Sequence, residues 1–184
     1  MTLILGVDPG LTRCGLGLIQ VGRDRKCHLV DVEVVRTQPD QVSEARIGAI
    51  GSRIREIVEK HRPAAIALER VFAQANLRTV MGTAQISGVV YFLADEFNIP
   101  VFTYTPTQVK AAVTGSGRAE KKQVGNMVAR VLGLDDAPKP ADAADALAIA
   151  ISHAWSGGSA TVSNIQTPAQ RAWAAAESAA KRSK

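Results

Sequence analysis

The first residues of the chain place a carboxylate at the end of a buried strand. Leu3 to Val7 is an unbroken apolar run that stops at Asp8-Pro9-Gly10. A short apolar run closed by such a turn is typical of a central strand covered on both faces. Asp8 would then either accept hydrogen bonds within the turn or look out into a crevice beside the sheet. The positions of the other acidic residues decide between these two readings.

Hydrophobic periodicity predicts an α/β order for the rest of the chain. Apolar or alternating runs indicate four further strands, at 15–19, 27–36, 64–69 and 100–104, with 27–36 at a sheet edge. Apolar spacings of three and four indicate helices at 43–61, 79–98, after Pro106, at 119–133 and from Ala141. The glycines near residue 15 would let another backbone or a ligand approach the second strand closely.

Composition fits a single globular domain in a reducing compartment. The chain has 184 residues and 46% hydrophobic content, enough for one domain with a proper core. It shows neither a signal peptide nor an uncharged segment of membrane-spanning length, so we expect a cytoplasmic protein with no membrane partner. Cys14 and Cys27 do not make a metal-ligand spacing, and we expect structural free thiols.

Charge and composition divide the chain near residue 155. The formal net charge is +5, of which the segment from Ser156 onward carries +3. That segment begins with Ser156-Gly157-Gly158-Ser159 and continues rich in alanine. We therefore predict a domain over 1–155 and a mobile, basic tail over 156–184. The weakly basic body permits a polyanionic partner such as nucleic acid without requiring one.

Three further acids stand at positions comparable to that of Asp8. Glu69 also ends a short apolar strand, and Asp142 and Asp145 are three apart at the start of a helix, on one face. Either aspartate could instead cap the helix. If the strands before Asp8 and Glu69 are neighbours, all four carboxylates can meet. Carboxylate-only ligation favours Mg²⁺, with Mn²⁺ as a substitute, and two such ions suit phosphodiester cleavage.

Basic and aromatic residues in two connections are candidates for nucleic-acid contact. A glycine-bearing loop and its flanks carry Lys110, Arg118, Lys121 and Lys122, and the polar connection 70–78 carries Arg70, Phe72 and Arg78. The lysines and arginines would either form a solvated surface or contact phosphates. Phe72 would either pack back locally or stack on a base.

Four motifs in sequence order resemble those of the bacterial RuvC Holliday junction resolvases. They are the segments 6–15, 68–72, 117–124 and 141–148, and the resemblance extends over residues 3–155. The first motif alone is not specific, because a strand followed by Asp-x-Gly also occurs in actin-like ATPases. The four together are specific.

The resemblance implies an RNase H-like fold, a mixed five-stranded sheet with helices on both faces. It implies a homodimer that cuts opposed strands of a four-way DNA junction, with the RuvA and RuvB branch-migration proteins as partners. Residue by residue, it makes Asp8, Glu69, Asp142 and Asp145 the metal-binding acids. Some relatives have histidine at the last position. Lys110 and Lys121 match basic residues at the scissile region, and Phe72 matches the aromatic residue that wedges into the junction.

Three other functions remain open at this point. An actin-like ATPase or sugar kinase shares the opening turn but needs two such domains, which 184 residues cannot supply. A ribonuclease of the same fold that acts on structured RNA differs only in its substrate. A module that binds branched DNA without cutting it would gain little from four clustered acids, because they repel a polyanion unless a cation is present.

Overall fold

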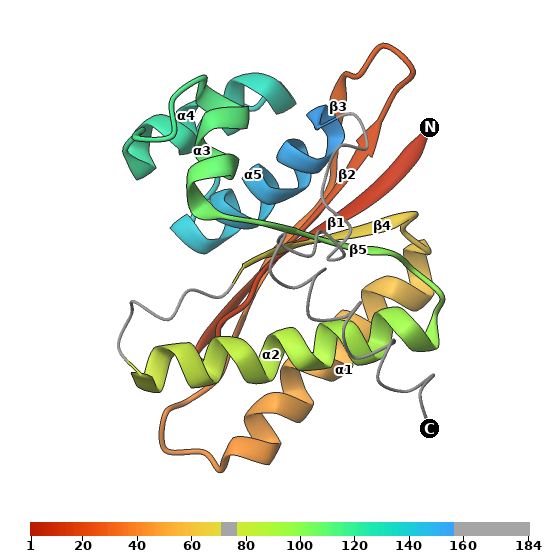
Figure 1. Cartoon of the computed structure of the whole chain (residues 1–184), viewed down its shortest axis with the longest axis vertical. Coiled ribbons are helices and arrows are strands. Elements are labelled where there is room, and N and C mark those ends of the chain that lie inside the picture. The colour runs from red at the N-terminus through yellow and green to blue at the C-terminus, as the bar shows by residue number, and fades with distance from the viewer. Residues whose placement is uncertain (71–76, 157–184) are drawn as a thin grey trace, which may run out of the picture.

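The computed structural model describes residues 1–70 and 77–156, and its elements follow one another as the periodicity predicts (Figure 1). The strands are β1 Thr2–Asp8, β2 Arg13–Val21, β3 Cys27–Arg36, β4 Ala65–Glu69 and β5 Val101–Tyr104. The helices are α1 Ser43–His61, α2 Leu77–Glu96, α3 Pro106–Thr114, α4 Lys121–Leu132 and α5 Ala141–Trp155. The predicted tail and Phe72 lie outside the described residues, so the predicted boundary at residue 155 stays a prediction.

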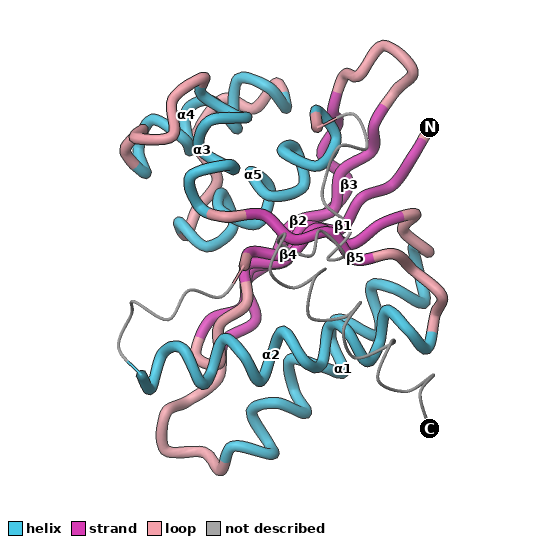
Figure 2. Tube along the Cα trace, in the orientation of Figure 1, coloured by secondary structure: helices cyan, strands magenta, loops and turns pink. Residues whose placement is uncertain are grey.

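The five strands form one mixed sheet in the order β3-β2-β1-β4-β5 (Figure 2). Strand β1 pairs antiparallel with β2, which pairs antiparallel with β3. On its other side β1 pairs parallel with β4, and β4 pairs parallel with β5. This arrangement confirms the mixed five-stranded sheet and the edge position of β3. It also makes β1 and β4 neighbours that end at the same side of the sheet.

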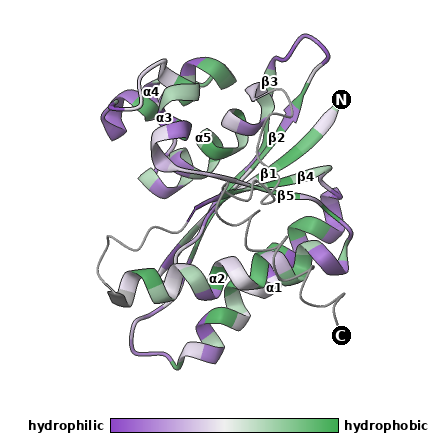
Figure 3. Cartoon of the chain, viewed as in Figure 1, coloured by the Kyte–Doolittle hydropathy of each residue, from purple (hydrophilic) through white to green (hydrophobic). Residues whose placement is uncertain are grey.

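Helices cover both faces of the sheet and give the domain two hydrophobic cores (Figure 1). Helices α1 and α2 cover one face, where Ile50, Ile54, Ile57 and Val58 of α1 are buried at the predicted helical spacing. Helices α3, α4 and α5 cover the other face. Figure 3 shows the result as hydrophobic central strands beside a hydrophilic β2–β3 turn. Burial of each large aliphatic side chain contributes roughly 1.5–3 kcal/mol, so both layers stabilise the sheet.

Helix α5 lies directly on β1 and β2 because glycines leave room for its backbone. A Cβ added at Gly6 would overlap the carbonyl oxygen of Ala146, and one added at Gly15 would overlap that of Asp142. A Cβ at Gly17 would lie 2.9 Å from the amide nitrogen of Leu147. The close partner of these glycines is therefore the α5 backbone. This contact brings the first turn of α5 to the end of β1, since Gly15 pairs with Asp8.

Two local expectations from the sequence are confirmed. Pro106 is the first residue of α3, and Thr105 and Gln108 form a reciprocal capping box before it. Cys14 and Cys27 are both buried free thiols. Within the described ranges, no helix combines the length and the apolar character needed to cross a membrane.

Candidate active site

Asp8 and Glu69 lie side by side at the carboxyl ends of two parallel strands. Val7 of β1 is in register with Leu68 of β4, so the next residue of each strand emerges at the same place. The two carboxyl groups are close enough that a proton shared between them would raise the pKa of Asp8 and lower that of Glu69. Adjacency of β1 and β4 is therefore the feature that turns two separate strand ends into one acidic pair.

Two negative charges on this half-buried pair would repel each other strongly. The pKa of Asp8 is raised from 3.8 to about 8, chiefly by burial and by the charge of Glu69, with smaller contributions from two aspartates of α5. Burial likewise raises the pKa of Glu69. The pair as a whole therefore holds a proton more readily than two separate carboxyl groups would. A cation beside the two groups would replace that proton and relieve the repulsion.

Asp142 and Asp145 reach the same place from the first turns of α5. Asp142 forms an ion pair with Arg13, whose Nε is 3.4 Å away, and Asp145 accepts a hydrogen bond from Lys121 Nζ at 2.9 Å. The residue that caps α5 is Pro140, which makes no side-chain capping bond. Within the described chain, both aspartates thus contact basic side chains. This is not the pattern expected of helix caps, which bond to backbone amides.

Two cavities share the Asp8–Glu69 pair as a common wall. The larger cavity, of about 950 Å³, is also lined by Asp142, Arg13 and Arg46, and we call it the cleft. The smaller, of about 300 Å³, also has Asp145, Lys110 and Lys121 in its lining. The four acids predicted from the sequence are thus distributed around two adjoining spaces.

The donor chemistry of this cluster fits a hard divalent cation. All four acidic groups offer carboxylate oxygens, the ligands preferred by Mg²⁺ and Mn²⁺. As the side chains stand, no three His, Cys, Asp or Glu residues in the described part of the chain converge closely enough to enclose an ion. Arg13 and Lys121 instead balance Asp142 and Asp145. The four acids thus line two adjoining cavities rather than one, and two of them contact basic side chains. Their joint ligation of metal ions stays a prediction.

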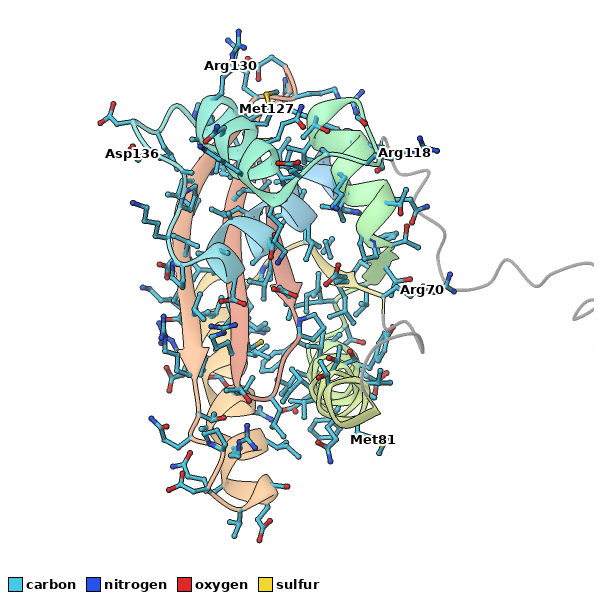
Figure 4. The ribbon with its side chains drawn as sticks, turned by 90° about the vertical axis from the view of Figure 1, so that its left-hand side faces the viewer. Arg70, Met81, Arg118, Met127, Arg130 and Asp136 are labelled. Carbon is cyan, nitrogen blue, oxygen red and sulfur yellow. The ribbon has the colours of Figure 1, made fainter. Side chains whose placement is uncertain are left out.

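The other basic residues singled out in the sequence occupy different places. Lys110 lines the smaller cavity, and its charge lowers the pKa of Glu69 in opposition to burial. Arg118 and Lys122 are exposed and line neither cavity. In Figure 4 Arg118 and the exposed Arg70 project from the same side of the molecule. The side chain of Arg78, like Phe72, lies outside the described residues.

The structure adds two arginines that sequence reasoning did not assign to the site. Arg13 is the first residue of β2, and its partner Asp142 belongs to the last described helix. Arg46 is in the first turn of α1 and lines the cleft with Asp8. From the sequence, Arg46 is indistinguishable from any solvated residue on the polar face of an amphipathic helix. Arg13 lies within the first of the four motifs, and this position is the sequence feature that could have assigned it to the site.

Comparison with known proteins points in one direction. A family model described as "Crossover junction endodeoxyribonuclease RuvC" matches residues 4–153. A protein of that name from Leifsonia xyli subsp. xyli is 54% identical over 95% of this chain and 91% of its own length. Another, from Pseudarthrobacter chlorophenolicus, is 52% identical over 100% of both chains. The solved structure of "T. thermophilus RuvC in complex with Holliday junction substrate" has a TM-score of 0.80 and 39% identity, covering 84% of this chain and 94% of that one.

Proposed function

Because the chain belongs to the RuvC family of crossover junction endodeoxyribonucleases, we propose that it resolves four-way DNA junctions by symmetric paired nicks at the Asp8–Glu69 pair. The chain is a nuclease, and its substrate is a DNA junction. The observation that supports the place of the reaction is the half-buried acidic pair, to which α5 adds two aspartates. Recombination and DNA repair are the processes in which such junctions arise and must be cut.

Family membership implies dependence on a divalent metal, which we propose to be two Mg²⁺ ions, with Mn²⁺ as a substitute. Asp8 and Glu69, which line both cavities, would hold the ions together with Asp142 and Asp145. When bound, such ions supply an activated water and stabilise the oxygen that leaves. Asp8 would have to give up its proton to serve as a ligand, so cation binding and proton release are coupled at this residue.

The residues of the chain orient the scissile phosphate and balance its charge. Water attacks the phosphorus, the bond to the 3′ oxygen breaks, and the products carry a 5′-phosphate and a 3′-hydroxyl. We propose that Lys121 contacts a phosphate oxygen, since its exposed ammonium group is held beside the site by Asp145. Lys110 lines the same cavity and would add a second positive charge. Arg70, Arg78, Arg118 and Lys122 would contact the junction farther from the cut, and Phe72 would stack on a base.

The decisive experiment compares three nucleic acids. The purified protein is incubated with a mobile four-way DNA junction, a matched DNA duplex and a structured RNA, each with Mg²⁺ or with EDTA. We expect paired nicks at symmetric positions in the junction alone, and only with metal. Cleavage of the RNA alone would make the chain a ribonuclease of this fold. Tight junction binding with no cut under any metal would contradict the nuclease proposal.

Symmetric cutting requires two active sites, and helix α2 offers a surface for a second copy of the chain. Met81 and Phe92 are 54% and 64% exposed, and Tyr91 is 45% exposed. Gly88, between them on the same helix, has open space where a Cβ would be. Residues 81, 88 and 92 are spaced by seven and four, so they share one helical face. This apolar face supports a homodimer through α2, whereas partnership with RuvA and RuvB rests on family membership alone.

Replacing Phe92 with glutamate should convert the dimer to a monomer, because two carboxylates would be buried at the contact without partners. Val30→Glu is the matched control, since Val30 is an exposed apolar residue, 41% accessible, on the distant edge strand β3. Sedimentation measures the oligomeric state, and the junction assay measures whether nicks still occur in pairs. A Phe92→Glu protein that remains dimeric and cuts in pairs would place the interface elsewhere.

A further inference from the structure

Arg46 has its guanidinium group fixed in one orientation by two hydroxyl groups. Its Nε donates to Thr37 Oγ1 and its Nη2 donates to Thr12 Oγ1, both at 2.9 Å. Thr37 is only 7% exposed, and its hydroxyl donates in turn to the carbonyl oxygen of Leu11 at 2.5 Å. A guanidinium has five N–H donors, so these two bonds leave the group oriented but not saturated.

The charge of Arg46 is balanced differently from that of its neighbours on α1. Arg53 is within 2.6 Å of both Glu33 and Glu56, and Arg55 makes a bidentate contact with Glu96 at 2.6 and 2.8 Å. For Arg46, by contrast, no carboxylate lies within ion-pair distance in the described ranges. A positive charge that is positioned by neutral groups alone retains its full attraction for an anion.

Arg46 presents this charge to the cleft that contains the acidic pair. Its neighbours in the lining include Thr12, Ser43 and Arg13, together with Asp8 and Glu69. Arg13 is engaged with Asp142, so Arg46 is the arginine of the lining that has no acidic partner in the described part of the chain. An anion drawn to Arg46 would therefore lie in the same space as a substrate of Asp8.

We propose that Arg46 binds a non-scissile phosphate of the DNA strand that is cut, and that Thr12 and Thr37 orient it for that contact. The inference rests on the proposed function, because it takes the cleft as the path of the DNA. The planar guanidinium suits two oxygens of one phosphodiester, and preorganisation by the two threonines reduces the entropy lost on binding. The contact is to the backbone, so it strengthens binding and sets register without reading the base sequence.

The test measures junction affinity in EDTA over a series of salt concentrations, for the wild type, Arg46→Gln and the matched control Arg53→Gln. The logarithm of the association constant falls as the logarithm of the salt concentration rises. Loss of one phosphate contact per subunit should make this negative slope shallower by about 0.9 per subunit. We expect this loss and a roughly three- to tenfold weaker affinity for Arg46→Gln, and an unchanged slope for Arg53→Gln. Equal slopes for all three proteins would show that Arg46 only braces the turn after β1.

Arg46→Lys keeps the test decisive if the glutamine variant does not fold. Lysine preserves the charge but cannot bond both threonines, so we expect a wild-type salt slope with a weaker affinity. Unchanged affinity together with a lower unfolding temperature would overturn the proposal, because it is the behaviour of a purely structural arginine. The cleavage assay on the wild-type protein distinguishes failure of this proposal from failure of the proposed function. If the wild type does not cut the junction, the proposed function is contradicted. If it does cut, and the Arg46 variants bind the junction with wild-type affinity and salt slope, only the phosphate contact is contradicted.

Discussion

Asp8→Asn should abolish junction cleavage and leave junction binding largely intact. The amide has nearly the same shape as the carboxylate but lacks the negative charge that a divalent cation requires at the centre of the site. We expect the nicking rate to fall by a factor on the order of 10³ or more. The measurement is the single-turnover nicking rate with Mg²⁺, set beside the junction dissociation constant in EDTA. Joint loss of folding and binding would instead make Asp8 a structural residue.

The same substitution should change how stability depends on pH in the absence of metal. Asp8 has a pKa of about 8 in the folded protein and an ordinary pKa of 3.8 when unfolded. Between these values the folded state binds more protons than the unfolded state, so the free energy of unfolding falls as pH rises from about 4 to about 8. Asparagine does not titrate, and Asp8→Asn should therefore be more stable than the wild type at pH 8, by an amount on the order of a few kcal/mol.

Urea denaturation in EDTA across this pH range measures the effect. Asp136→Asn, at an exposed position between α4 and α5 that lines neither cavity (Figure 4), is the control for the loss of one negative charge. The control should follow the wild-type curve. If Asp8→Asn also follows that curve, the carboxyl group of Asp8 is not buried among like charges in the way the structure shows.

Gly6→Ala is expected to disrupt the contact between the central strand and α5. The added methyl group would overlap the carbonyl oxygen of Ala146 and lie 2.8 Å from the amide nitrogen and 2.9 Å from the Cβ of Ala150. The backbone atoms of α5 cannot move aside as the end of a flexible side chain can. We expect a loss of about 3 kcal/mol or more in the free energy of unfolding. Cleavage should fall as well, because α5 carries Asp142 and Asp145.

Gly48→Ala is the matched control for this substitution. Gly48 is exposed in the interior of α1 and has no atom within 4 Å of an added Cβ. Alanine there should stabilise the protein by about 0.5–1 kcal/mol, since it is the better helix former. Urea denaturation compares both variants with the wild type. A Gly6→Ala protein as stable as the wild type would be incompatible with so close an approach of α5 to β1.

Short-range patterns were sufficient to predict the elements and the acidic residues. Apolar runs closed by Asp8 and Glu69 predict strands that end in carboxylates, and the structure confirms both strand ends. The spacing of Ile50, Ile54 and Ile57 predicts the buried face of α1. These predictions succeed because the period of side-chain burial is a local property of helices and strands. Residue types also narrow the chemistry, since four carboxylates without histidine or cysteine favour a hard cation.

The sequence by itself thus determined the strands, the helices and the carboxylates that we propose for the active site. Only the tertiary structure decided which of them meet: β1 beside β4, Arg13 against Asp142, and Lys121 against Asp145. It also decided that burial and the charge of Glu69 raise the pKa of Asp8 and that Arg46 faces the cleft among neutral hydroxyls. The physical reason is that burial, charge coupling and hydrogen bonding depend on distances between groups far apart in the chain, which packing alone establishes.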